Sequence, residues 1–216
     1  MKNLIIAFVL VLSLSGYSQT YTNDDRSLTG VFEAPNKTKA EIFSAINKWI
    51  SINYNSGKSV TQLSDADAGN IVVKGINSTM YRNTYKILYP NMKGVPDYYP
   101  LSLNHLIEVN VKDNKFRITY RLIDYSPAIP AVPYSLDDVA YNCINFNGSS
   151  DESILAYNNR VDSLLKMGLV GKTKRESVSA TAKPAFDELS ATLIADMKKT
   201  MESINKSITS PTSNEW

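Results

Sequence analysis

The chain is poor in the residues from which most enzyme sites are built. Of its 216 residues, one is a cysteine and one is a histidine. The single Cys143 excludes an internal disulfide, so we expect a buried apolar residue there, with an intermolecular bridge as the alternative. His105 falls in an alternating strand pattern and has no serine or cysteine partner at a recognisable spacing, which favours a core or edge position over catalysis. The carboxylates are too scattered to nominate a catalytic pair, and we predict a protein that is not an enzyme.

The chain also lacks a strong charge of either sign. It has 23 Lys and Arg against 21 Asp and Glu, a formal net charge of +2. Binding to a phosphate backbone needs a basic stripe, so the composition gives no support for a nucleic-acid partner.

Complete metal and cofactor motifs are absent. Asp65-Ala-Asp67-Ala-Gly69 begins like a calcium loop, but Gly69 stands where the third oxygen ligand belongs, and the later glycine and glutamate are missing. Gly171-Lys-Thr173 invites a nucleotide-binding interpretation, but Lys166 stands where a phosphate-binding loop has its first glycine. We therefore predict no cofactor, a tight turn at Asp65 to Gly69 with a metal site as the alternative, and a linker at Gly171.

The N-terminus has the pattern of a secretory signal. Lys2 precedes an apolar run from Leu4 to Leu14, and small residues follow around Ser18. The run is too short for a membrane-spanning helix, and Tyr17 stands where a lipoprotein has its lipid-bearing cysteine. We predict cleavage between Ser18 and Gln19, export to the periplasm or beyond without a lipid anchor, and no integral membrane span. An uncleaved helix is the alternative.

The stretch from His105 to Ile123 predicts one long β-hairpin. Apolar residues alternate with polar ones on both arms. If Asp113 and Asn114 form a two-residue turn, Val111 faces Phe116 and both apolar rows fall on one side, which sets the register.

Other elements precede the hairpin. Leu28 to Ala34 is a plausible first strand after a polar segment, 19–27. Thr38 and Glu41 form a capping box before a helix from about Lys39 to Asn53, whose apolar face includes Trp49 and should pack on a sheet. Short strands are expected through Val60 and Leu63 and over 71–76.

The segment Thr79 to Asn104 is rich in tyrosine and turn residues and is interpreted as a long loop. Its adjacent Tyr98 and Tyr99 cannot both point into one core from an extended segment, so at least one should be exposed. With Arg117 and Arg121 on the hairpin's outer row, these tyrosines form our candidate binding surface. The alternatives are tyrosines that simply pack on the sheet edge, and an outer row that is merely solvated.

After the core domain, 28–123, we expect a segment 124–182 with three prolines, a helix capped by Asp151 and a polar linker from Gly168 to Lys183. A last amphipathic helix over 183–208 should belong to the core, and the tail, 209–216, should be disordered. This order of elements predicts an α+β fold in which helices cover one face of an antiparallel sheet.

Three short motifs add a family resemblance. Thr38-Lys-Ala-Glu41-Ile-Phe43 opens the tryptophan-bearing helix, Asp65 and Gly69 precede a strand, and Val111-Lys-Asp-Asn-Lys-Phe-Arg117 spans the hairpin turn. Over roughly Leu28 to Ile123, the chain resembles an exported family of unknown function from Bacteroidetes. The resemblance implies a fold like that of the TATA-binding protein, and the family offers no catalytic residues to transfer.

These patterns favour an exported, non-enzymatic binding or accessory module of the bacterial cell envelope. Its partner would be an envelope protein, a peptide or a glycan, and the alternative is a structural subunit that pairs through its last helix. An enzyme with an unrecognised site is the third possibility. DNA binding does not follow from the fold likeness, because function lies in sites rather than in folds.

Overall fold

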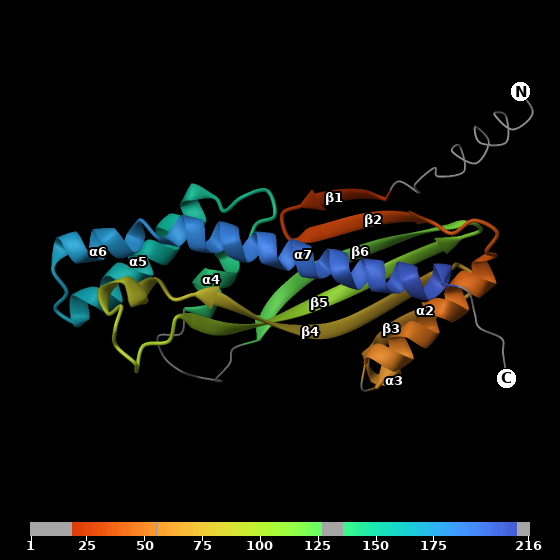
Figure 1. The fold of residues 1–216 in the computed structure, drawn as a ribbon, viewed down its shortest axis with the longest axis horizontal. Coiled ribbons are helices and arrows are strands. Elements are labelled where there is room, and N and C mark those ends of the chain that lie inside the picture. The colour runs from red at the N-terminus through yellow and green to blue at the C-terminus, as the bar shows by residue number, and fades with distance from the viewer. Residues whose placement is uncertain (1–18, 55, 127–135, 211–216) are drawn as a thin grey trace, which may run out of the picture.

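The computed structural model describes residues 19–54, 56–126 and 136–210 and shows an elongated α+β molecule (Figure 1). Six antiparallel strands form one sheet in the order β1-β2-β6-β5-β4-β3. The strands are β1 (Thr20–Asp24), β2 (Ser27–Glu33), β3 (Thr61–Asp65), β4 (Asn70–Arg82), β5 (Tyr98–Lys112) and β6 (Lys115–Ser126). The helices are α2 (Lys39–Asn53), α3 (Gly57–Val60), η1 (Thr84–Leu88), α4 (Asp137–Cys143), α5 (Asp151–Met167), α6 (Lys172–Ser179) and α7 (Ala182–Thr209).

The predicted hairpin is the centre of the sheet, with its register confirmed. Strands β5 and β6 pair Val111 with Phe116, Val109 with Ile118 and Ile107 with Tyr120. Asn114 in the turn has a φ of 63°, in the left-handed region that asparagine tolerates. Because side chains alternate along each strand, this register places the apolar rows of both strands on one face.

Helix α2 begins and ends where the sequence predicts. The Oγ of Thr38 accepts from the Glu41 N–H, and the Glu41 carboxylate accepts from the Thr38 N–H at 2.8 Å, so both halves of the capping box are present. Hydrogen bonds that the Glu41 carboxylate accepts from the backbone N–H and, to a smaller extent, the hydroxyl of Thr38 lower the pKa of Glu41. Trp49 is buried on the apolar face, as predicted, and donates from Nε1 to the Ser203 Oγ of α7 at 3.0 Å.

Helices α2 and α7 pack on the same face of the sheet, and α7 runs along it for most of the length of the molecule (Figure 1). The apolar residues of α7, from Phe186 to Ile208, are buried there. Their partners on the sheet include Leu28, Phe32, Ile71, Val73, Leu103, Ile107, Val109, Phe116 and Ile118. We call the side of the sheet that these helices leave uncovered the open face.

The prediction of a long loop over Thr79 to Asn104 is wrong. Strand β4 continues to Arg82, η1 follows, and β5 starts at Tyr98. Strand β4 pairs with β5 from Asn70 opposite Asn110 to Arg82 opposite Tyr98. The sequence of this stretch does not indicate a strand pairing, because its residues are polar or turn-forming and half of them face solvent.

Other expectations also need correction. The polar stretch after Gly168 is no linker, since α6 forms within it and buries Val178. The polar segment before β2 contains the strand β1, and the expected strand through Val60 starts only at Thr61, after the one-turn α3. The signal segment, the residues 127–135 with their prolines and most of the tail lie outside the described residues.

The turn from Asp65 to Gly69 connects β3 to β4, as the strand-to-strand interpretation predicts. Asp65 accepts the Ala68 N–H at 2.8 Å, and Gly69 has a φ of 71°, which favours glycine. Within the described residues, no helix is long and apolar enough to cross a membrane.

Candidate binding surfaces

The two adjacent tyrosines at the start of β5 point to opposite faces of the sheet, which confirms that at least one is exposed. Tyr98 is 40% exposed and lies opposite Arg82, whose guanidinium carbon is 5.9 Å from the ring centroid. Tyr99 is half-buried on the helix-covered face, with its ring centroid 5.9 Å from that of Tyr81. Burial raises the pKa of the Tyr99 phenol. Only Tyr98 therefore offers a surface to a partner.

A groove of about 320 Å³ begins beside Tyr98, between the end of β4 and the first half of α7. Met80 supplies exposed apolar surface, and an ion pair of 2.7 Å between Arg82 and Glu188 crosses from the strand to the helix. Both charged groups are about half exposed, so the pair contributes little to stability.

Arg117 and Arg121 lie on the open face but differ in what they contact. The Nε and Nη2 of Arg117 both donate to the Asn110 Oδ1, at 3.1 and 2.7 Å, so the guanidinium is held along the hairpin. Arg121 is exposed and lines a separate polar cavity of about 440 Å³. Asp24, Asp25 and Arg26 line this cavity too, so its charges are mixed.

Hydrogen bonds from the α4–α5 connection hold the wall of this cavity. The Phe146 N–H donates to the Asp25 carbonyl at 2.6 Å, and the Asn23 Nδ2 donates to the Phe146 carbonyl at 2.9 Å. The Arg26 Nε donates to the Ile144 carbonyl at 3.1 Å, while its guanidinium carbon lies 4.3 Å from the Tyr141 ring centroid. Segments far apart in the chain thus meet at the β1–β2 turn.

The four predicted residues do not form one surface. Arg117 pairs across the sheet at Asn110, whereas Tyr98 lies twelve residues earlier on β5, about 40 Å away at the usual rise of a strand. Tyr99 faces the core. Arg121 lines the polar cavity, and Tyr98 lines the groove beside α7.

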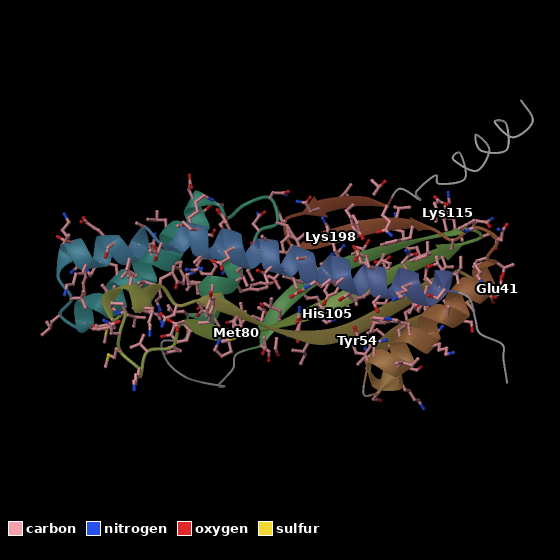
Figure 2. The ribbon with its side chains drawn as sticks, viewed as in Figure 1. Glu41, Tyr54, Met80, His105, Lys115 and Lys198 are labelled. Atoms are coloured by element: carbon pink, nitrogen blue, oxygen red, sulfur yellow. The ribbon has the colours of Figure 1, made fainter. Side chains whose placement is uncertain are left out.

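His105 and Cys143 are both buried, at 4% and 0% exposed. The His105 ring lies 4.7 Å from that of Tyr120, and the Tyr54 hydroxyl, just after α2, is 3.5 Å from its Nε2 (Figure 2). Burial lowers the pKa of His105 to about 4 and raises that of the Cys143 thiol to about 12. At neutral pH, both side chains are uncharged parts of the core.

The open face carries apolar side chains that the sequence analysis did not single out. Ile76 is 65% exposed and Met80, labelled in Figure 2, is 55% exposed, both on β4. Val31, Leu63 and Tyr98 are also exposed on this face. Val72, Ile76 and Met80 share one face of the extended strand, but a spacing of four residues fits a helix face equally, so the spacing does not by itself reveal this surface. No group of three metal-ligating side chains occurs within the described residues.

Comparison with solved structures gives two similar chains. A DUF4468 family protein from Bacteroides ovatus aligns with a TM-score of 0.48 at 11% identity, covering 94% of this chain and 95% of the other. A TBP-like protein from Parabacteroides distasonis aligns with a TM-score of 0.43 at 18% identity, covering 85% and 94%.

No curated protein matches this chain. The family whose model matches residues 29–126 is described as a domain of unknown function (DUF4468) with TBP-like fold. That range runs from β2 to the end of β6 and contains the capped helix and the central hairpin. The domain formed by residues 29–126 therefore belongs to the DUF4468 family and has the TBP-like fold.

Proposed function

We propose that this chain is an exported, non-enzymatic module of the cell envelope that binds a protein partner through the open face of its sheet. The observation that carries the proposal is the pair of exposed apolar side chains on β4, Ile76 and Met80. Exposed apolar groups that gather on one face mark interaction sites more often than singly scattered ones do. Export rests on the sequence of the first 18 residues.

The buried state of His105 and Cys143 supports a binding role over catalysis. A general base or nucleophile must reach its substrate, and neither side chain is open to solvent.

The alternative of a subunit that pairs through its last helix has less support. Helix α7 already buries its apolar residues against the sheet and α2, so it has no continuous apolar stripe left for a partner helix. Size-exclusion chromatography with light scattering tests this alternative, which predicts a stable oligomer.

Capture from envelope extract tests the proposal. The variant carrying Ile76→Ser and Met80→Ser removes the apolar pair from the open face. A variant carrying Ile52→Ser and Met167→Ser makes the same chemical changes at positions that are 71% and 70% exposed on α2 and α5. We expect the wild type and the second variant to retain the same captured protein and the first to lose it. Equal capture by both variants would refute the proposed face.

A further inference from the structure

We propose that the free edge of β4, from Lys74 to Arg82, binds an extended peptide of the partner by adding it to the sheet as a strand, with acidic residues at the ends of that peptide and apolar residues between them. The inference rests on the proposed binding function and names the mode and the chemistry of the contact.

The edge exists because β3 is shorter than β4. Strand β3 pairs with β4 only as far as Val73, opposite Thr61, and among the described residues no other strand lies on that side. From Lys74 to Arg82 the strand pairs with β5 alone, and no backbone hydrogen bond links this stretch to any other described residue. Its outward N–H and C=O groups are therefore a template for another strand.

The other edge of the sheet is a poorer template. Strand β1 has five residues, Thr20 to Asp24, and carries no aliphatic side chain. The free stretch of β4 is longer and offers Ile76 and Met80 to solvent. Where it ends, Met80 and Tyr98 line the groove beside α7.

The charges along the edge of β4 indicate which peptide sequence would bind there. The residues of β4 that face the open side are, in order, Lys74, Ile76, Ser78, Met80 and Arg82. A strand that pairs with this row is favoured by opposite charges and by apolar groups directly across from their counterparts. The row reads nearly the same in both directions, so the complementary pattern is acidic, apolar, polar, apolar, acidic for either strand orientation.

Lys74 and Arg82, at the two ends of this row, can both pair with a carboxylate of the bound peptide. Lys74 is exposed and forms no ion pair with any described residue. Arg82 is paired with Glu188, but that pair is half exposed, and the planar guanidinium has further donors for a second carboxylate.

A second copy of this chain fits the edge less well than such a peptide. Residues directly opposite in an antiparallel pair share a face, so a two-fold axis that uses the whole stretch passes through Ser78. Ile76 would then lie opposite Met80, but Lys74 would lie opposite Arg82, and like charges in that position are destabilising.

Binding of synthetic peptides tests the inference. The first probe is as long as the stretch 74–82 and has the sequence Glu-Thr-Val-Thr-Thr-Thr-Val-Thr-Glu, and the second has lysine in place of both glutamates. Fluorescence anisotropy of labelled peptides gives the dissociation constants. We expect the wild type to prefer the acidic peptide by about two- to thirtyfold, the range for two cross-strand charge pairs.

Lys74→Glu should reverse part of that preference, weakening the acidic peptide and strengthening the lysine peptide. Lys112→Glu is the matched control, because Lys112 is exposed on the same face of β5 at the hairpin end, where it lies opposite Lys115. The control should keep the wild-type preference. Circular dichroism melts establish that both variants are folded.

Hydrogen exchange of the backbone amides distinguishes a peptide that adds to the sheet as a strand from one that docks on the open face. Bound acidic peptide should slow exchange at alternate amides within 74–82, whereas docking on the face would leave these edge amides unprotected. The inference is overturned by the absence of acidic-peptide binding up to about 1 mM. Equal binding of both peptides, unprotected edge amides, or self-association that Lys74→Glu abolishes would overturn it too. If the peptides fail while Ile76→Ser with Met80→Ser still loses the captured protein, the proposed function stands and the partner docks on the face.

Discussion

The imidazole of His105 fills the space above Gly75 on the neighbouring strand. The two residues are register partners, and a Cβ at position 75 would lie 2.7 Å from Nε2 and 2.8 Å from Cε1. The Tyr54 ring stands on the other side of the same space, 3.2 Å from that Cβ position. Glycine here makes room for a buried ring.

Gly75→Ala should therefore destabilise the fold by about 1 to 3 kcal/mol, the range for overpacked cores. Chemical denaturation measures the loss. Gly94→Ala is the control, since nothing lies within 4 Å of the Cβ position there. A neutral Gly75→Ala would show that the ring moves aside at no cost.

Stability should fall as the pH drops from about 6.5 toward 4. Burial lowers the pKa of His105 from 6.5 to about 4, so between these values the unfolded chain takes up a proton that the folded chain excludes. That uptake favours unfolding, by at most about 3 kcal/mol at pH 4, and has no effect above the unfolded pKa. Denaturation of the wild type and of His105→Leu over this range isolates the effect, because no other histidine is present. If the stabilities of the wild type and of His105→Leu fell in parallel with pH, the prediction would be wrong.

Trp49→Ala should cost about 3 to 5 kcal/mol, the range for truncating a buried aromatic residue. Trp49 is 8% exposed and is tied to α7 through Ser203, so its loss opens a cavity between two helices and the sheet. Ile52→Ala on the same helix, at a position 71% exposed, should change the free energy of unfolding by less than about 0.5 kcal/mol. A loss below about 1 kcal/mol at Trp49 would place the indole on the surface.

Replacement of the two adjacent tyrosines should have unequal effects. Tyr98→Ser, on the open face, should leave stability within about 0.5 kcal/mol, as surface changes do. Tyr99→Ser should cost more than about 1 kcal/mol, because it removes the contact with Tyr81 in the core. Thermal and chemical denaturation of the two single variants measures both losses of stability. Equal losses would contradict the prediction.

The mature protein should begin at Gln19. Intact mass and N-terminal sequencing of protein from the envelope fraction test the cleavage, which follows from the apolar run and the small residues before it. Leu10→Arg, which places a charge within that run, should leave the precursor uncleaved. A wild-type mass that retains residues 1–18 would contradict the prediction.

The sequence predicts best where local chemistry and long-range packing agree. The hairpin register followed from alternation on both arms, and the bounds of α2 followed from Thr38, Glu41 and an apolar face. The fold class followed from the order of these elements.

The second half of β4 could not be predicted in this way, because Asn77, Ser78 and Thr79 have no alternation of polarity to reveal a strand. Helix α6 was missed because its only buried residue is Val178. Contacts that no local pattern contains also connect it to α5, such as the hydrogen bond of 2.6 Å from the Arg175 Nε to Asp162.

The candidate site was harder still. Exposure of one of the two adjacent tyrosines followed from simple geometry, although which of them faces solvent did not. Which strand lies at an edge depends on the lengths of its neighbours. The free edge of β4 exists only because β3 stops opposite Val73. The cavity beside Arg121 likewise needs segments near residues 24 and 145 to meet, which neither segment shows alone.

The strand order has a consequence for the sequence of folding events. The hydroxyls of Thr29 and Thr119 lie 3.2 Å apart across β2 and β6, although the two residues are 90 positions apart in the chain. The hydrogen bond from the Asn23 Nδ2 to the Asn147 Oδ1 spans 124 positions. The β5–β6 hairpin can close from local contacts, whereas pairings of such separation form slowly, because a long loop must close before they are gained. Strands β1 and β2 leave the ribosome before the other strands and can pair with each other locally, yet β2 finds its partner β6 only after the rest of the sheet has been made.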